Sequence, residues 1–210
     1  MIVIVDYGQG NLFSIAQAMK KLGADAEISA KAQEILRAER VVLPGVGAFG
    51  TAMRHLSDLS LIEPLLEITA NGTPLLGICL GMQLLAESSV EFGHHEGLGL
   101  IGGRVTKLPE GKGQPGAGRI PNVGWRRLHI TAKDPLLSGL GREPMVYFVH
   151  SHALEAADPN VVSAILPVNG RDTVAAVRKG NIMGYQFHPE NSGPIGLEFL
   201  RCFLSLPRAV

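Results

Sequence analysis

One cysteine of this chain stands in a setting that suits nucleophilic chemistry. Cys79 lies between Gly77 and Gly81 in the segment GICLG, after an apolar run and before a helical pattern. A strand that turns at once into a helix strains the residue at the turn, and its neighbours must be small. This is the geometry of the nucleophile elbow, G-x-S-x-G, with sulfur in place of oxygen. Because a helix start favours the thiolate, we interpret Cys79 as a candidate nucleophile, although free cysteines are more often buried structural residues.

A thiol nucleophile needs a base, and the base needs a group that orients it. His188 and Glu190 offer such a pair in the segment QFHPE, which follows an apolar strand. Glu190 would fix the tautomer of His188 and stabilise its charged form. A solvated loop histidine and a metal ligand are the competing interpretations. The other histidines show no spacing typical of zinc sites, so the sequence predicts neither a metal nor a cofactor.

The glycine-rich segment GVGAFG, at residues 45–50, matches the G-x-G-x-x-G pattern of dinucleotide-binding loops. Such a loop belongs in the first βα turn, with an acidic residue at the end of a second strand about 20 positions further on. This segment follows a later strand, and the region 20 positions on is the helix predicted over residues 59–70, so neither condition is met. A second use fits better, because backbone N–H groups beside a nucleophile elbow can stabilise an oxyanion. We expect one such donor at Val46 or Gly47 and another at Leu80.

These groups depend on the strands and helices that position them. In the first half of the chain, short apolar runs alternate with helical patterns, which predicts βαβ units and a parallel sheet covered on both faces. The predicted strands are residues 2–6, 26–29, 40–45 and 74–78, and the predicted helices are residues 12–22, 59–70 and 80–88.

The second half of the chain has short strands with few helices between them, which suggests antiparallel additions to the main sheet. Residues 109–118 predict a surface loop. Ser192 can cap a final helix that has Pro194 in its first turn. The buried stripe of this helix is predicted at Phe199, Leu200, Phe203 and Leu204. The expected fold is α/β, a single domain over residues 1–210 with a mixed, mainly parallel sheet, helices on both faces and short antiparallel strands.

Composition excludes several classes of partner. The chain has 19 Lys and Arg against 19 Asp and Glu, so it lacks the basic excess that nucleic acid or an anionic membrane would favour. No apolar run approaches the ~20 residues of a membrane span. We expect no signal peptide, since no basic region precedes the first apolar run. The two cysteines, Cys79 and Cys202, lie far apart in the sequence and could form at most one disulfide bond. We therefore expect a reducing, cytoplasmic setting.

The segments GICLGMQLL, QFHPE and PGVGAFG together resemble the class I (triad) glutamine amidotransferases. The further segments DYGQGNLFS, GLGLIGGRV, IPNVGW and YFVHSH resemble the glutaminase subunits of imidazole glycerol phosphate synthase, an enzyme of histidine biosynthesis. The resemblance covers nearly the whole chain and implies a flavodoxin-like fold. It implies that Cys79 attacks the side-chain amide of L-glutamine, that His188 protonates the leaving ammonia and then activates water, and that Glu190 orients His188.

The same resemblance implies roles for further residues. Ammonia would pass to a partner cyclase subunit, a (β/α)₈ barrel. The chain departs from the family pattern at three positions, where tyrosine, histidine and lysine are usual, namely His152, Asn122 and Asn191. The implied glutamine-binding residues are Gly45, Val46, Gly47, Leu80, Gln83, Glu87, Ser151 and His152. The residues implied to face the cyclase are Asn11, Asn122 and Trp125.

Two rival hypotheses predict the same fold but a different function. Another small cysteine hydrolase, such as a peptidase or the glutaminase of a different pathway, would keep Cys79 and His188 and change the partner. A non-catalytic ligand-binding or regulatory domain would release no glutamate. The rate of glutamate release in a Cys79→Ala variant, and its dependence on a cyclase, separate these hypotheses.

Overall fold

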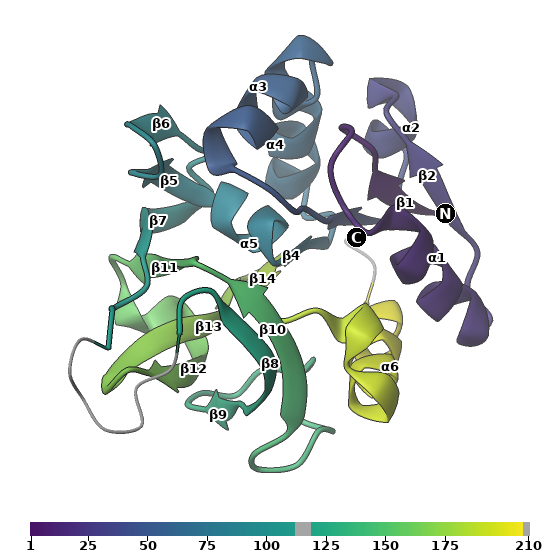
Figure 1. The fold of residues 1–210 in the computed structure, drawn as a ribbon. Helices are drawn as coiled ribbons and strands as arrows, with labels where there is room; N and C mark the ends of the chain where they lie inside the picture. The colour runs from purple at the N-terminus through teal and green to yellow at the C-terminus, as the bar shows by residue number, and fades with distance from the viewer. Residues whose placement is uncertain (112–118, 208–210) are drawn as a thin grey trace.

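The structure of this chain is a computed structural model, which describes residues 1–111 and 119–207. Most of the surface loop predicted at residues 109–118 therefore lies outside the described residues. In the described part, an eight-stranded mixed sheet forms the centre of the molecule (Figure 1). In spatial order its strands are β2 (Ala26–Ser29), β1 (Ile2–Val5), β3 (Arg40–Leu43), β4 (Leu75–Ile78), β14 (Ile182–Tyr185), β13 (Arg171–Lys179), β12 (Val162–Val168) and β9 (His129–Ile130).

The sheet changes character along this order. The strands from β2 to β14 run parallel, whereas β13, β12 and β9 each run antiparallel to the strand before them. The strands β1, β3, β4 and β14 are buried along their whole length, as expected of parallel strands covered on both faces. The predicted α/β fold, with its mixed, mainly parallel sheet, is confirmed.

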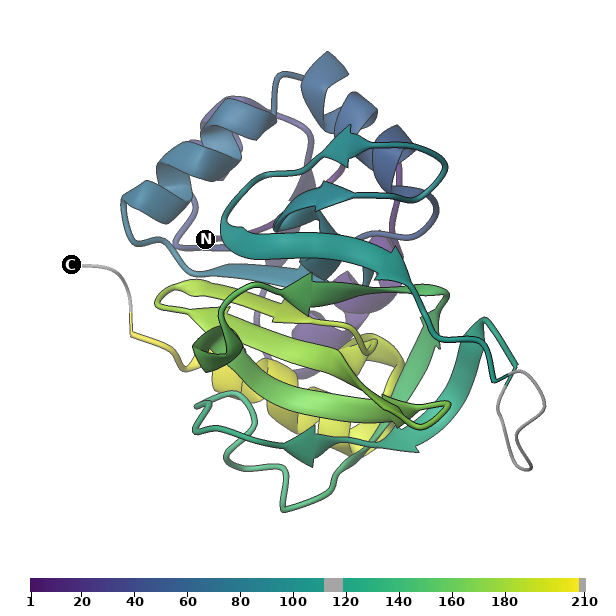
Figure 2. The same ribbon diagram turned by 90° about the vertical axis from the view of Figure 1, so that its left-hand side faces the viewer.

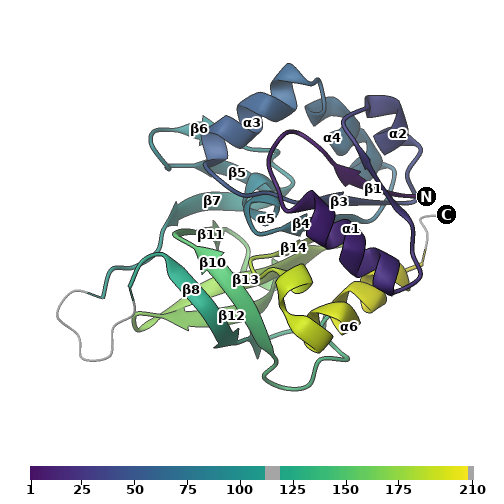
Figure 3. The ribbon, with the colours of Figure 1, turned by 45° about the vertical axis from the view of Figure 1, so that its right-hand side comes forward.

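Helices cover both faces of the sheet. One apolar cluster joins α1 and α6 to one face, and a second cluster joins α2, α3 and α4 to the other (Figure 3). No helix of the described ranges is long and apolar enough to cross a lipid bilayer. The helices are α1 (Leu12–Lys21), α2 (Ala32–Leu36), α3 (Phe49–Asp58), α4 (Ile62–Ala70), α5 (Leu80–Leu84) and α6 (Gly193–Leu204).

Two smaller sheets lie on the side that Figure 2 turns toward the viewer. One pair consists of β8 (Asn122–Arg127) and β10 (Met145–His150). A second group, in spatial order, consists of β11 (His152–Ala156), β7 (Ile101–Lys107), β5 (Ala86–Ser89) and β6 (His95–Glu96). Two short 3₁₀ turns lie in the described residues, η1 (Pro159–Val161) and η2 (Pro189–Asn191).

The helix predicted over residues 59–70 begins later than expected. The structure has α4 there, preceded by a turn and by α3, which the sequence analysis missed. Ser60 adopts a positive φ of 55°, which ends helical geometry between the two helices. Pro64 lies in the first turn of α4, where a proline is tolerated. The start of α3 lies within the glycine-rich segment GVGAFG, where no local signal indicates a helix.

The helix after Cys79 is also shorter than predicted. The sequence predicts a helix over residues 80–88, but α5 ends at Leu84 and β5 follows. The carbonyls of residues 84–87 accept hydrogen bonds of 2.9 Å from N–H groups of residues 97–101, instead of continuing the helical ladder. Gly97 permits this approach, since a Cβ there would lie 2.2 Å from the carbonyl oxygen of Ala86. The prediction was wrong because a distant segment takes the last acceptors of the helix.

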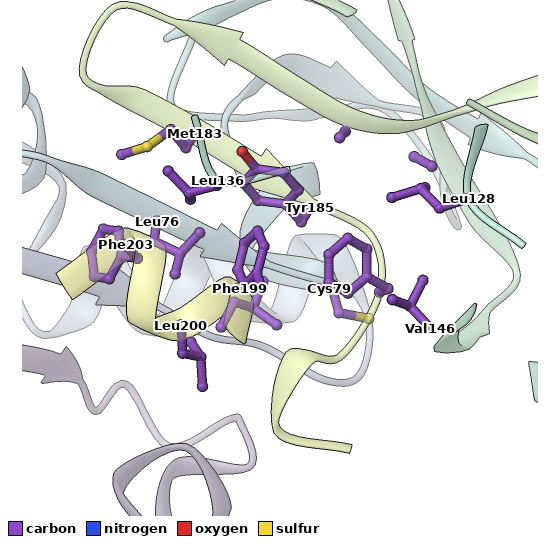
Figure 4. Close-up of a cluster of buried hydrophobic side chains, with 14 of the residues drawn as sticks. Leu76, Cys79, Leu128, Leu136, Val146, Met183, Tyr185, Phe199, Leu200 and Phe203 are labelled. Carbon is purple, nitrogen blue, oxygen red and sulfur yellow. The ribbon is translucent and has the colours of Figure 1, made fainter. Parts of the chain in front are cut away.

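The C-terminal helix α6 packs where its sequence pattern predicts. Phe199, Leu200 and Phe203 are buried, whereas Leu204, the fourth residue of the predicted stripe, is only partly buried. Figure 4 shows Phe199 beside Tyr185 of β14. The same cluster includes Cys79. Ser192 stands at the N-cap position, but its side chain makes no capping hydrogen bond, contrary to the prediction. Its hydroxyl is engaged elsewhere, as described for the site below.

Candidate active site

Cys79 stands at the junction of β4 and α5 with a φ of 55° and a ψ of −110°. A positive φ is strained for a residue with a Cβ, so the surrounding structure must hold it. The two flanking glycines make the turn possible. A Cβ on Gly77 would lie 2.8 Å from the carbonyl oxygen of Gly81, and a Cβ on Gly81 would lie 1.8 Å from that of Leu43. The structure therefore has a tight strand-to-helix elbow with the cysteine at its apex.

His188 comes soon after β14, the strand beside β4 in the sheet. Its Nδ1 lies 2.9 Å from Oε1 of Glu190, and both side chains are almost fully buried. An ionised carboxylate can only accept hydrogen bonds, so Nδ1 carries the proton and donates a hydrogen bond to Glu190. The other ring nitrogen, Nε2, has no hydrogen-bond partner among the described residues. That nitrogen is left for chemistry in the space that His188 shares with Cys79.

The charge on His188 depends on its two neighbours. Burial by itself would lower the pKa of His188, because it penalises the charged ring. The attraction of Cys79 and Glu190 for that ring outweighs burial and raises the pKa to about 10. The sulfur does not meet the geometry of a hydrogen bond to Nε2, so its effect here is electrostatic. The imidazolium is the favoured form near neutral pH, and it stabilises a thiolate beside it.

Three elements fix the segment that carries His188. Its backbone N–H donates to the carbonyl of Tyr147 in β10 at 2.9 Å. The hydroxyl of Ser192 donates to the carbonyl of His188 at 2.7 Å and accepts from the N–H of Tyr147 at 3.0 Å. Asn11, before α1, donates from Nδ2 to Oε1 of Glu190 at 3.3 Å. His188 is thus tied to β10 and to the start of α1 as well as to the chain that follows β14.

A cavity of about 210 Å³ opens beside Cys79. Residues far apart in the chain form its wall, so only the tertiary structure creates it. Glu190 lies behind His188, outside this lining. The predicted site residues that line the cavity are Val46, Gly47, Cys79, Leu80, Gln83, Ser151, His152 and His188. The other lining residues, which the sequence analysis did not assign to the site, are Glu91, Val149 and His150.

Two residues expected at this site do not line the cavity. Gly45 is the first residue of the glycine-rich segment, and a Cβ there would be 2.4 Å from the hydroxyl of Tyr7. That hydroxyl donates to the carbonyl of Pro44 at 2.8 Å and anchors the start of the loop. Glu87 is exposed on β5 and accepts from the N–H of Gly103 at 2.9 Å. Glu87 turns away because α5 ends before it, so it does not share a helical face with the cavity residues.

Glu91 brings a carboxylate to the cavity instead. Its Oε2 accepts from the backbone N–H of Phe49 at 2.8 Å, and its Oε1 lies 3.3 Å from Nδ1 of His152. Glu91 is in the loop between β5 and β6, which folds back to the start of α3. No local sequence pattern marks this residue, because its position depends on that long-range contact.

The three predicted interface residues lie in different environments. Trp125 is 46% exposed on β8, and its ring meets that of Tyr147 edge-on, with centroids 6.2 Å apart. Asn11 is half-buried beside the catalytic candidates described above. Asn122 is buried, and its Nδ2 lies 2.9 Å from Nε2 of His150. Burial lowers the pKa of His150 to about 4, so this ring is neutral and Nε2 accepts. The structure therefore places Asn122 inward, against the cavity wall.

Comparisons with known proteins agree with this geometry. The family model described as "Glutamine amidotransferase class-I" matches residues 3–205. The "Imidazole glycerol phosphate synthase subunit HisH" of Wolinella succinogenes is 44% identical over 208 residues, covering 98% of this chain and 100% of that protein. The protein of the same name from Geobacter sulfurreducens is 42% identical, covering 96% of this chain and 97% of its own.

Solved structures share the fold. One described as "Crystal structure of glutamine amidotransferase" superimposes with a TM-score of 0.73 at 22% identity, covering 96% of this chain and 98% of its own. The "Structure of PurLQS from Thermotoga maritima" superimposes with a TM-score of 0.74 at 20% identity, covering 97% and 96%. At this level of identity the likeness shows the architecture alone.

A family match over almost the whole chain establishes its class, and the chain belongs to the class I glutamine amidotransferases. The full-length relatives narrow that class. Since they are 42–44% identical over almost the whole chain, the chain belongs among the HisH subunits of imidazole glycerol phosphate synthase. Both findings confirm the resemblance that the motifs indicated.

Proposed function

We propose that this chain is a glutaminase subunit, which hydrolyses L-glutamine to glutamate and ammonia for an imidazole glycerol phosphate synthase in histidine biosynthesis. The relatives named HisH support the pathway. One observation carries the chemistry: Cys79 and His188 line one cavity, and Glu190 holds His188 from behind. A nucleophile, a base and an orienting group are the parts that acyl transfer needs.

The reaction begins with the thiolate of Cys79, which attacks the side-chain amide carbon of glutamine and forms a C–S bond. When the tetrahedral intermediate collapses, the C–N bond breaks and the proton on Nε2 of His188 passes to the leaving nitrogen. Ammonia departs and a thioester remains. His188 then takes a proton from water, whose oxygen attacks the thioester. The C–S bond breaks, glutamate leaves, and the thiolate and imidazolium return, while Glu190 keeps the ring in one tautomer.

Backbone N–H groups stabilise the oxyanion of both tetrahedral intermediates. Leu80 follows the nucleophile directly and supplies one donor. Val46 or Gly47 supplies the other from the glycine-rich loop, which lines the same cavity. Gly47 has a φ of 100°, a backbone conformation that glycine adopts without the steric strain that a side chain would cause. Loss of one such donor typically costs an enzyme about 10²–10³ in kcat.

Two acceptors in the cavity suit the α-ammonium group of glutamine. Both N–H groups of the Gln83 amide are in use, one to the carbonyl of His152 at 3.0 Å and one to Oε1 of Gln186 at 2.9 Å. Its Oε1 is the part available to substrate. The carboxylate of Glu91 is the second acceptor, and charge-assisted hydrogen bonds of this kind are strong. The backbone at Ser151 and His152 completes the wall around the substrate.

The ammonia passes to a cyclase subunit, a (β/α)₈ barrel that docks on the outer face of β8 and β10 (Figure 3). The register places Val123 opposite Val149 and Trp125 opposite Tyr147. Val123, Val149 and Trp125 are each 40–46% exposed. Exposed apolar patches of this kind mark interaction sites. Val149 also lines the cavity, so a partner seated there excludes water from the departing ammonia. The cytoplasm suits this chemistry, because a reducing compartment keeps the thiol of Cys79 free.

The test of the chemistry is glutamate release by Cys79→Ala in the presence of a candidate cyclase and its nucleotide. We expect release to fall at least about 10³-fold, because no other group forms the thioester. Cys202→Ala is the matched control, since Cys202 lies in α6 outside the cavity, and it should keep the rate. A glutamine analogue with a leaving group should label Cys79 alone. Undiminished release from Cys79→Ala would refute the assignment.

A second measurement tests the pathway. The glutaminase rate is compared with and without the cyclase and its nucleotide. We expect the complex to be faster, because docking closes the cavity beside Val149. A rate indifferent to that partner would favour the glutaminase of another pathway.

A further inference from the structure

Gln186 lies between β14 and the proposed base, and the chemistry above gives it no role. Strand register brings it to the nucleophile: Tyr185 pairs with Ile78, so Gln186 continues one strand as Cys79 continues the other. The side chain of Gln186 is fully buried. Its Nε2 lies 3.5 Å from Sγ of Cys79, and its Oε1 lies 2.9 Å from Nε2 of Gln83.

A backbone carbonyl decides which end of the Gln186 amide faces the sulfur. The carbonyl of His152 can only accept, so the Gln83 atom 3.0 Å from it must be the amide nitrogen. The second N–H of that nitrogen points to Gln186, so the Gln186 atom there must be Oε1. The NH₂ group of Gln186 is then left facing the sulfur. Turning either amide over would bring two donors or two acceptors together.

The sulfur of Cys79 thus lies between a donor and an acceptor. The acceptor is the carbonyl oxygen of Val149, at 3.8 Å, to which a thiol can donate. A thiolate can only accept, so it gains from the N–H of Gln186. We propose that Gln186 is a thiolate-stabilising residue, whose amide donates a hydrogen bond to Sγ of Cys79. The carbonyl of His152 sets the orientation of that amide by fixing the orientation of the Gln83 amide. The inference rests on the proposed function, which makes Cys79 the nucleophile.

Other ionisable groups face the same sulfur from the neighbouring elements. His188 approaches from the segment after β14. Tyr7 approaches from the end of β1, and burial, with the charge of Cys79, raises the pKa of Tyr7 far above its usual value, so it stays neutral. Across the cavity stand Glu91, His150 and His152. Because these groups also influence the thiolate, a test of Gln186 must leave them unchanged.

The test is the pH dependence of Cys79 alkylation by iodoacetamide, followed by mass spectrometry of the peptide that contains Cys79. This readout needs neither glutamine nor a partner subunit. Gln186→Met replaces the amide with an apolar side chain of similar length. We expect the midpoint of the profile to rise by about one pH unit, so that the rate at a pH well below both midpoints falls about tenfold, which is the effect of losing one hydrogen bond to a charged group. Gln186→Glu puts a negative charge beside the sulfur and should raise the midpoint further.

Two more variants make the result specific. Gln33→Met makes the same chemical change on the exposed surface of α2 and should leave the profile unchanged. Gln83→Met keeps Gln186 but removes the donor that sets the sense of its amide, so we expect a smaller upward movement of the midpoint. This variant also supplies the test if Gln186→Met does not fold.

A midpoint that coincides with that of the unchanged protein in the Gln186 variants and in Gln83→Met would overturn the proposal. A lower maximal rate with an unmoved midpoint would overturn it as well, because that result indicates packing alone. The proposed function fails separately, if Cys79→Ala still releases glutamate, so the two failures are distinguishable.

Discussion

Cys79 and His188 follow neighbouring strands, β4 and β14, but different forces hold them. On the β4 side, steric exclusion fixes the elbow, because Gly81 leaves no room for a methyl group against the carbonyl of Leu43. On the β14 side, a hydrogen bond that His188 donates to Glu190 and hydrogen bonds with other elements hold His188. A backbone clash cannot be relieved by a small movement, whereas each hydrogen bond contributes about 1 kcal/mol. We therefore expect a single substitution in the elbow to abolish the fold or much of its stability. Substitutions around His188 should each remove only part of its support.

The largest effect should come from Gly81→Ala. An alanine usually stabilises a helical position by about 1 kcal/mol relative to glycine. Here its Cβ would lie 1.8 Å from the carbonyl oxygen of Leu43, so we expect a loss of more than about 3 kcal/mol in the free energy of unfolding, or no folded protein. Gly23→Ala is the control. Gly23 has a φ of 76° with no atom within 4 Å of its ideal Cβ, so strain alone should cost about 1–2 kcal/mol. Urea denaturation that ranks Gly81→Ala as the more stable variant would contradict steric control of the elbow.

The next effect is a pH dependence of stability that comes from His188. Its pKa in the folded protein is about 10, above the value of about 6.5 expected when unfolded. The stabilisation is therefore fully present below about pH 6.5 and is lost as the pH rises through 10. We expect the free energy of unfolding to fall with pH over this window, relative to His188→Gln, by on the order of 2 kcal/mol. Denaturation curves at several pH values measure the difference, and parallel profiles for the two proteins would count against an ion pair at the base.

Ser192→Ala should have an intermediate effect. It removes the hydroxyl that joins the carbonyl of His188 to the N–H of Tyr147, and that side chain is fully buried. We expect a loss of about 1–3 kcal/mol in stability and a severalfold lower kcat for glutamine hydrolysis. Ser138→Ala, which removes an exposed hydroxyl, should change stability by less than about 0.5 kcal/mol. Equal thermal midpoints for the two variants would show that this bridge does not hold the base.

The smallest effect should come from Asn11→Ala. Its hydrogen bond to Glu190 is long, at 3.3 Å, and the side chain is only half-buried. We expect kcat for glutamine hydrolysis to fall about 2–10-fold at an unchanged KM, with stability nearly unchanged. Asn71→Ala, on an exposed residue after α4, should leave kcat alone. A kcat in Asn11→Ala that matches the control would mean that α1 does not help to position Glu190.

The elements nearest the two reactive groups were predictable because their signals are local. The apolar, β-branched runs before Asp6, Pro44 and Cys79 are typical of buried strands, and the structure confirms β1, β3 and β4. The two glycines around the cysteine predict the elbow, since only small residues fit such a turn. QFHPE likewise places a base and a carboxylate together by their spacing alone.

The differences between expectation and structure have long-range causes. The end of α5 depends on residues 97–101, which take its carbonyls, and this is why Glu87 does not reach the cavity. Glu91 reaches it only because its loop meets the start of α3. Asn122 resembles an interface residue in its motif, but the pairing of β8 with β10 turns it inward to His150. None of these contacts leaves a periodic pattern in the segment that makes it.

Local sequence was enough to specify a strained cysteine, a histidine next to its carboxylate, and the alternating elements that carry them, because each depends on neighbours within a few residues. Only the assembled sheet decided that β14 lies beside β4, which puts Gln186 and His188 next to Cys79. Only the packed loops decided which acid and which amides surround the cavity. The reason is physical: strand order and loop contacts are selected by burial and hydrogen bonding summed over the whole chain, so no single segment contains the information.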